Sequence, residues 1–147
     1  MQAKNRVGEQ ASMLGVMIAG ENWLVDMKDV SEVLPVPRLT RVPLSKKWFR
    51  GVANIRGNLH CIADVAEYMH KGAIKTDAAN RVLIIAERHL FNAALLVDRV
   101  LGLRDMRSWQ ESEHEGLLKY QDAQGTVWCK LNVTDLLNQN EFLQVGI

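Results

Sequence analysis

The chain has 147 residues, of which 48% are hydrophobic and 24% charged, an ordinary globular usage that excludes a disordered or low-complexity protein. Its 18 basic and 17 acidic residues leave a formal charge of +1, which gives no general attraction to nucleic acid or to an anionic membrane surface. No apolar run reaches the roughly 20 residues of a membrane helix, and the polar N-terminus lacks the apolar core of a signal peptide. These features predict a cytoplasmic protein that does not insert into a membrane.

The first third of the chain is predicted to form short strands. Residues 1–12 are polar and are expected to be a mobile tail, followed by one domain over residues 13–147. Two short apolar runs on either side of a Gly-Glu-Asn turn predict a β-hairpin over residues 14–27. Residues 30–34 lead into three prolines, which favour an edge strand or an extended connection over a long helix.

The middle of the chain combines turn signals with short apolar runs. Residues 45–49 could form one helical turn that begins at a serine. Residues 52–56 and 59–63 predict a second hairpin around a Gly-Asn turn. Asp64, with a glutamate three residues later, has the spacing of an N-cap for a short helix.

The second half repeats this pattern. Runs of β-branched and large apolar residues predict strands over residues 81–86, 91–97, 100–104, 117–120 and 126–131. Residues 108–116 are acidic and have no apolar period, so a loop is expected there. Thr134 could cap a last short helix. Many short strands with little helix predict a mainly β fold, either a small barrel or a sandwich.

Two short stretches recur nearly half a chain length apart and in the same order. Leu24-Val-Asp26 returns as Leu96-Val-Asp98, and Cys61-Ile-Ala-Asp-Val65 returns as Cys129-Lys-Leu-Asn-Val133. Two similar β units would explain this echo. It predicts that Cys61 and Cys129 are buried structural residues on equivalent strands.

Enzyme chemistry is not favoured. His60 and Cys61 are neighbours on a predicted strand, where they would point to opposite faces and could not form a dyad. Asp64 and Asp98 fit a cap and a strand end better than a catalytic carboxylate pair. The four histidines are scattered without metal-ligand spacing, and no cofactor-binding motif is present. The residues therefore predict a non-catalytic interaction module without a cofactor.

A basic segment leaves one alternative open. Between Glu32 and Asp64 there is no acidic residue, and Trp48 and Phe49 lie among six bases, which are Arg38, Arg41, Lys46, Lys47, Arg50 and Arg56. Small β barrels bind single-stranded nucleic acid with such surfaces, although their pI usually exceeds about 9 and here it is about 7.8. A basic face that docks on an acidic protein explains the segment equally well. Arg56 is either an exposed charge or, if covered, the partner of Glu32.

Several segments of the chain together resemble the CheW family of chemotaxis coupling proteins. The segments that carry this resemblance in the first half are Val30-Ser-Glu-Val-Leu34, Arg41-Val-Pro43, Phe49-Arg-Gly-Val-Ala-Asn-Ile-Arg-Gly57 and Ile62-Ala-Asp-Val65. In the second half, residues 95–103 and 126–137 are similar to later strands and the closing helix of the family. The residues around the Gly-Val-Ala-Asn-Ile-Arg-Gly core look most like members from type IV pilus and twitching chemosensory systems. His60 and Cys61 depart from the family pattern, which usually has a proline and a bulky apolar residue there.

The resemblance implies a fold and a function. The fold would be two SH3-like, five-stranded β barrels with a shared apolar core and few short helices. Such proteins are scaffolds that bind the cytoplasmic tip of a chemoreceptor and the regulatory domain of a CheA-type histidine kinase, without catalysis or cofactor. Receptor binding would use a groove between the barrels, and kinase binding the barrel ends. The resemblance places five residues at or near the receptor-facing region: Val30, Glu32, Gly51, Arg56 and Gly57. It also implies that Arg56 pairs with Glu32.

Overall fold

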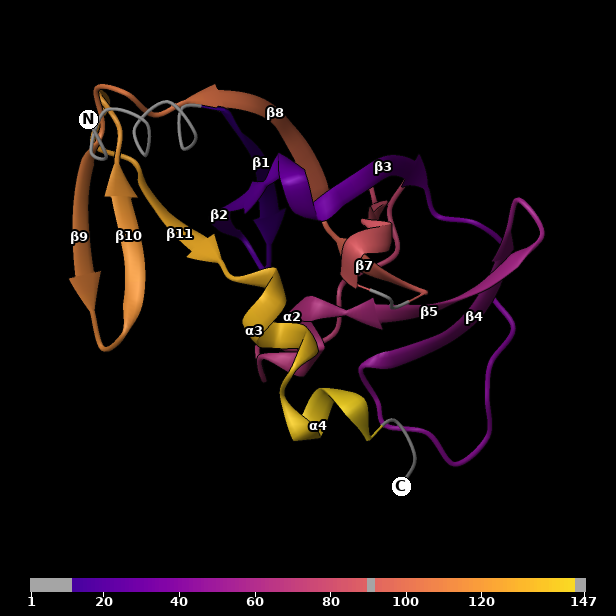
Figure 1. Cartoon of the computed structure of the whole chain (residues 1–147). Helices are drawn as coiled ribbons and strands as arrows, with labels where there is room; N and C mark the ends of the chain where they lie inside the picture. The colour runs from indigo at the N-terminus through magenta and orange to yellow at the C-terminus, as the bar shows by residue number, and fades with distance from the viewer. Residues whose placement is uncertain (1–11, 90–91, 145–147) are drawn as a thin grey trace.

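The computed structural model describes residues 12–89 and 92–144, whose strands form two sheets (Figure 1). The order in the six-stranded sheet is β8 (Arg99–Asp105), β1 (Ser12–Ile18), β2 (Glu21–Asp26), β11 (Val127–Leu131), β10 (Leu117–Gln121) and β9 (Gln110–His114). The order in the five-stranded sheet is β3 (Val30–Pro35), β6 (Arg81–Ile85), β7 (Ala93–Val97), β5 (Asn58–Asp64) and β4 (Phe49–Ile55). The predicted mainly β class is confirmed. Most of the expected N-terminal tail lies outside the described residues, and Ser12 already belongs to β1.

Short helices follow or connect the strands. They are the α-helices α2 (Val65–Tyr68), α3 (Val133–Leu137) and α4 (Asn140–Leu143), and the 3-10 helices η1 (Met27–Asp29) and η2 (Glu87–His89). In the described residues, no helix has both the length and the apolar character needed to cross a bilayer.

The two sheets repeat one topology. Each contains a parallel pair, β5 with β7 in the five-stranded sheet and β11 with β2 in the six-stranded sheet, and the remaining strand pairs are antiparallel. Each parallel pair is flanked by one hairpin partner on either side. The recurring stretches of the sequence occupy these equivalent strands, Leu24 on β2 and Leu96 on β7, Cys61 on β5 and Cys129 on β11. The echo therefore marks a repeated structural unit.

Helix capping repeats as well. The Asp64 carboxylate accepts a hydrogen bond from the Glu67 amide at 3.0 Å and caps α2, as its spacing predicts. At the corresponding place after β11, the Asn132 side chain accepts from the Asp135 amide at 3.0 Å and caps α3. The prediction that Thr134 caps this helix is wrong, because Thr134 already lies inside it. The recurring stretches of the sequence would have identified the correct cap, since Asp64 aligns with Asn132.

Two other local predictions are wrong. Residues 45–48 form no helical turn, since the Ser45 hydroxyl donates back to the Val42 carbonyl at 2.7 Å and Phe49 begins β4. The acidic segment expected to be a loop contains β9, so one sheet has six strands rather than five. Every residue of β9 is exposed, and its described pairing is with β10 alone. A strand exposed on both faces needs no apolar alternation, which explains why the sequence shows none.

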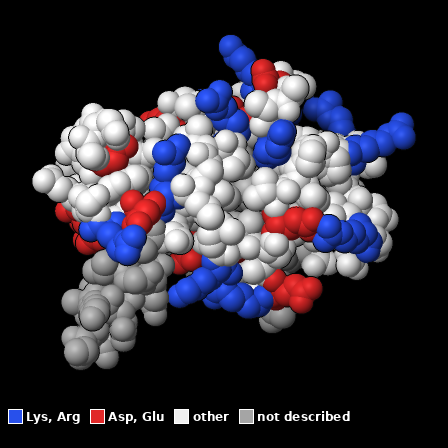
Figure 2. All heavy atoms as spheres, turned by 90° about the horizontal axis from the view of Figure 1, so that it is seen from above, with Lys and Arg blue, Asp and Glu red and all other residues white. Residues whose placement is uncertain are grey.

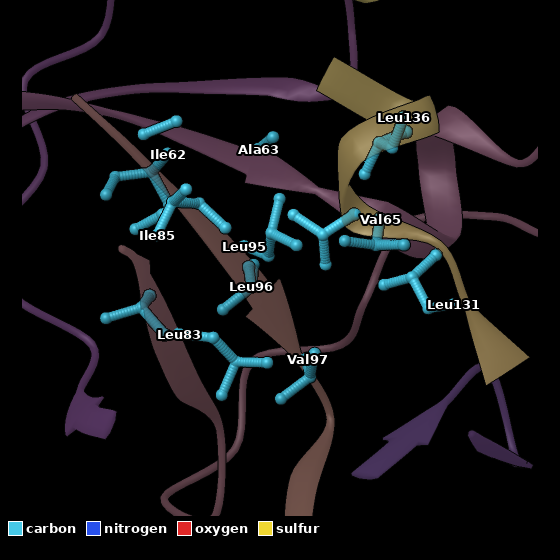
Figure 3. Close-up of a cluster of buried hydrophobic side chains, with 14 of the residues drawn as sticks. Ile62, Ala63, Val65, Leu83, Ile85, Leu95, Leu96, Val97, Leu131 and Leu136 are labelled. Carbon is cyan, nitrogen blue, oxygen red and sulfur yellow. The ribbon is translucent and has the colours of Figure 1, made fainter. Parts of the chain in front are cut away.

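The main apolar core is shared by the two sheets. It contains Val16 and Val25 from the six-stranded sheet together with Leu83 and Leu95 from the five-stranded sheet. Figure 3 shows Leu131 of β11 and Leu136 of α3 pointing toward Val65 and Leu95, so the segment after β11 closes the core from one side. A shared core holds the two sheets in one arrangement and fixes the surfaces between and beside them.

Candidate partner-binding surface

Arg56 and Glu32 form a two-pronged ion pair. Arg56 Nη1 donates to Glu32 Oε1 at 2.5 Å, and Arg56 Nη2 donates to the second carboxylate oxygen. The Arg56 side chain is 72% exposed and that of Glu32 is 27% exposed. Arg56 is thus both exposed and paired, which combines the two alternatives that its sequence left open. An exposed pair of this kind contributes only about 0–1 kcal/mol to stability, so its value lies in holding the guanidinium in one orientation.

The local backbone directs Arg56 outward. Arg56 and Gly57 both have positive φ, 53° and 84°, and form the tight turn between β4 and β5. The turn therefore falls one residue earlier than the expected Gly-Asn. Asn54 Oδ1 accepts a hydrogen bond from the Gly57 amide at 2.9 Å and braces the turn. An arginine in left-handed backbone is uncommon, and such positions persist where the surrounding structure holds them.

The ion pair joins the two edge strands of the five-stranded sheet. Glu32 lies on β3, the first strand in the sheet order, and Arg56 follows β4, the last strand. The sheet must curl for these edges to meet, and the β4–β5 turn lies at the right of Figure 1, beyond the end of β3. Arg56 could not reach Glu32 without this curvature, so the pair is a product of the tertiary fold.

A hollow of about 460 Å³ opens beside the pair. Its buried lining is apolar and consists of Ile55, Ile84 and Ile85. Its more exposed lining is polar and consists of Ser31, Glu32, Arg56, Asn58, His60, Glu87 and Asn92. An apolar floor with a polar rim is the usual composition of a site that receives a side chain of a partner.

The remaining expected site residues act through the backbone or the core. Val30 is buried at the start of β3 and belongs to the shared core. Gly51 is buried on β4, where a Cβ atom would lie 2.3 Å from the Thr40 carbonyl oxygen. Thr40 and Val52 exchange backbone hydrogen bonds of 2.8 and 2.9 Å at this point. The structure thus brings Glu32, Arg56 and Gly57 together at the surface, while Val30 and Gly51 support it from within.

Sequence reasoning missed a second, more deeply covered ion pair. Arg50 donates to the Asp64 carboxylate through Nε at 3.2 Å and Nη2 at 3.0 Å. Asp64 also accepts from the Ile74 amide at 2.9 Å, and Arg50 donates to the Ile74 carbonyl at 2.8 Å. The Asp64 side chain is 0% exposed. No local pattern links these residues, because Arg50 and Asp64 meet across a hairpin and Ile74 lies in an irregular connection.

The expectation that Cys61 is buried is wrong, whereas Cys129 is half-buried. Cys61 is the central residue of β5 and the last exposed one before the buried end of the strand, and its neighbour His60 lines the hollow. Partial burial raises the pKa of the Cys61 thiol and also that of Cys129. A raised thiol pKa leaves little thiolate at neutral pH, so neither cysteine is an activated nucleophile.

We expect a maleimide to modify Cys61 in the native protein, with Cys129 reacting more slowly because it is less accessible. The raised pKa should keep the Cys61 rate below that of a free thiol at pH 7, and the rate should rise with pH as thiolate forms. Mass spectrometry of labelled peptides separates the two sites. Native protection of Cys61 as strong as that of Cys129 would contradict the arrangement of β5.

The basic segment does not form a nucleic-acid platform. Trp48 and Phe49 are buried, and the Trp48 ring stacks on Phe142 with centroids 5.1 Å apart, so neither aromatic is free to stack on a base. Two of its six bases, Arg50 and Arg56, are held in ion pairs. On the face shown in Figure 2, basic and acidic side chains are interspersed among uncharged areas. The nucleic-acid alternative therefore loses the stacking surface on which it depended.

The fold and its sequence define the class of this protein. The CheW-like domain family matches residues 12–141, and the chain belongs to that family. The fold is also similar to the crystal structure of the scaffolding protein TtCheW from Thermoanaerobacter tengcongensis, with a TM-score of 0.71 and 18% sequence identity. That match covers 88% of this chain and 94% of the other. The resemblance found in the sequence is confirmed.

A particular relative is Protein PilI of Pseudomonas aeruginosa. The two chains are 33% identical over 104 residues, which is 71% of this chain and 58% of PilI. The chain thus spans less than two thirds of that relative's length.

Proposed function

We propose that this protein is a non-catalytic adaptor that couples a chemoreceptor to a CheA-type histidine kinase in a chemosensory array. Its membership of the CheW family supports the scaffolding role, and its similarity to PilI supports a link to type IV pili and twitching motility. The adaptor acts in the cytoplasm, where the receptor tip and the kinase meet.

The observation that carries this proposal is the ion pair between Glu32 and Arg56. It presents a largely exposed guanidinium in a fixed direction, at the point where the two edge strands of one sheet meet. A pre-oriented charged group loses little side-chain entropy on binding, so it suits the recognition of polar groups on a helical receptor. Gly57 completes the turn that aims Arg56, and Gly51 and Val30 hold β4 and β3 beneath it.

The kinase's regulatory domain is proposed to bind a different surface, at the ends of the β units. Separate surfaces let one copy of the protein hold both partners at once. Binding to the two partners should therefore respond independently to substitutions at Arg56.

Removal of the Arg56 side chain is the direct test. We expect Arg56→Ala to weaken binding to the receptor's cytoplasmic fragment at least tenfold, because truncation of a hot-spot arginine at the centre of an interface costs about 2 kcal/mol or more. Binding to the kinase should be retained. Isothermal titration calorimetry with each partner in turn measures both affinities.

Two further variants make the result interpretable. Arg56→Gly removes the same guanidinium but also relieves the left-handed backbone at this position, so it should lose receptor binding without loss of stability. Lys46→Ala, in the loop that precedes β4 and away from the Arg56 end of that strand, should bind both partners normally. A folded Arg56→Ala variant with unchanged affinity for the receptor would contradict the proposed surface.

A further inference from the structure

The hollow beside the ion pair contains a carboxylate without a partner. Glu87 lies on η2, is exposed, and has no hydrogen bond or ion pair among the described residues. Its two basic neighbours are engaged elsewhere, since Arg88 Nη2 donates to Asp29 and His89 Nε2 lies 2.8 Å from the same oxygen. Glu32, the other carboxylate of the hollow, is already neutralised by Arg56. Among the residues that the structure describes, the hollow therefore has one free negative charge, that of Glu87.

The polar groups around this charge also favour a donor. His60 Nδ1 lies 3.2 Å from the Asn58 carbonyl oxygen. A carbonyl only accepts, so this contact needs the proton on Nδ1 and leaves Nε2 as an acceptor in the neutral ring. The side-chain amides of Asn58 and Asn92, which can accept as well as donate, add further hydrogen-bonding groups to the same hollow.

We propose that this hollow receives a lysine or arginine side chain from the receptor helix that docks on the Glu32–Arg56 surface. The head of that side chain binds Glu87, and its methylene stem lies on the floor of Ile55, Ile84 and Ile85. This inference rests on the proposed function, because it takes the neighbouring ion pair as the receptor surface.

Other occupants fit the hollow less well. An acidic side chain would meet Glu87 with like charge. A purely apolar side chain would remove water from Glu87 and from the amides without replacing their hydrogen bonds, which is unfavourable. A long basic side chain satisfies both parts of the lining at once.

A small probe tests the chemistry of the hollow without the receptor. The probe is N-acetylarginine amide, titrated into the ¹⁵N-labelled full chain, with N-acetylleucine amide as the matched control. We expect saturable chemical-shift changes at the amides of Asn58, His60, Glu87 and Asn92 with the arginine probe only. Glu87→Gln should abolish them. Saturable binding of the leucine probe there, or arginine shifts confined to the acidic strand β9, would overturn the proposal.

The receptor fragment tests the interface itself. Glu87→Gln should weaken its binding about tenfold or more, as expected for loss of one charge-assisted contact. Glu113→Gln is the matched control, because it removes the same charge from an exposed strand of the other sheet and should leave binding unchanged. If Arg56→Ala abolishes receptor binding but Glu87→Gln leaves it intact, the hollow is not the subsite and the proposed function stands. If neither variant weakens binding, the receptor surface itself is wrongly placed.

Discussion

Replacement of Asp64 with alanine is expected to lower the free energy of unfolding by about 3–5 kcal/mol, the range for breaking a buried ion pair. Four described hydrogen bonds end on this fully buried carboxylate: two from Arg50, one from the Ile74 amide and one from the Glu67 amide. The variant would leave the Arg50 guanidinium without its counter-charge and two amides without acceptors. Urea denaturation followed by circular dichroism measures the loss.

The repeat in the fold provides a matched control. Asn132 caps α3 as Asp64 caps α2, but its described contacts are limited to that helix and it is exposed. Asn132→Ala should therefore cost only about 1 kcal/mol, the usual value of an N-cap. Equal and small losses at the two positions would show that Asp64 is merely a cap and that water replaces it at Arg50 and Ile74. Asp64→Asn keeps the cap but removes the charge, and should fall between the two.

Gly51→Ala is expected to lower the free energy of unfolding by about 3 kcal/mol, from backbone strain and overpacking together. Gly51 has φ of 127°, a region that L side chains rarely adopt, and a Cβ atom there would lie 2.3 Å from the Thr40 carbonyl oxygen and 2.9 Å from its carbon. These are backbone atoms of Thr40, which cannot rotate away as a flexible side chain would. The contact between Thr40 and Val52 must therefore shift or break.

Gly57→Ala is a control that separates the cost of backbone strain from the cost of the steric clash at Gly51. Gly57 also has positive φ, 84°, but apart from its two chain neighbours no described residue has an atom within 4 Å of a Cβ atom built on it. This variant should cost about 1 kcal/mol, the conformational term alone. Thermal unfolding of both variants, together with the amide signals of Thr40 and Val52, checks the comparison. A Gly51→Ala variant as stable as Gly57→Ala would mean that the Thr40 segment moves aside freely, and Gly51 would then have no structural role.

The position of Gly51 also decides how an effect of Gly51→Ala on receptor binding should be interpreted. The structure places Gly51 under the surface rather than on it, next to the segment that continues from β3. Loss of receptor binding in Gly51→Ala would therefore reflect displacement of β3 and its Glu32. Arg56→Gly does the reverse, because it removes a side chain from the contact surface while it relieves strain in the backbone. Together the two variants distinguish a residue that contacts the receptor from one that only supports the surface.

Local sequence patterns predicted most strands correctly because their causes are local. The hairpins β1–β2, β4–β5 and β10–β11 follow from short apolar runs separated by turn residues. The N-cap at Asp64 follows from the hydrogen-bonding needs of the first helical turn. The acidic strand β9 was not predicted, because a strand exposed on both faces has no alternation of apolar and polar residues.

The sequence by itself determined the family, the strand-rich class, the half-chain repeat and the pairing of Arg56 with Glu32, the last through resemblance. Only the tertiary structure decided how these parts meet. Whether Cys61 is covered depends on the neighbours of β5, and whether Arg50 reaches Asp64 depends on the twist of a hairpin and on the path of residues 69–80. The hollow at Glu87 needs β3, β5, β6 and η2 to converge at one end of a curled sheet. Side-chain exposure and long-range pairing are set by contacts between segments far apart in the chain, and no local pattern encodes them.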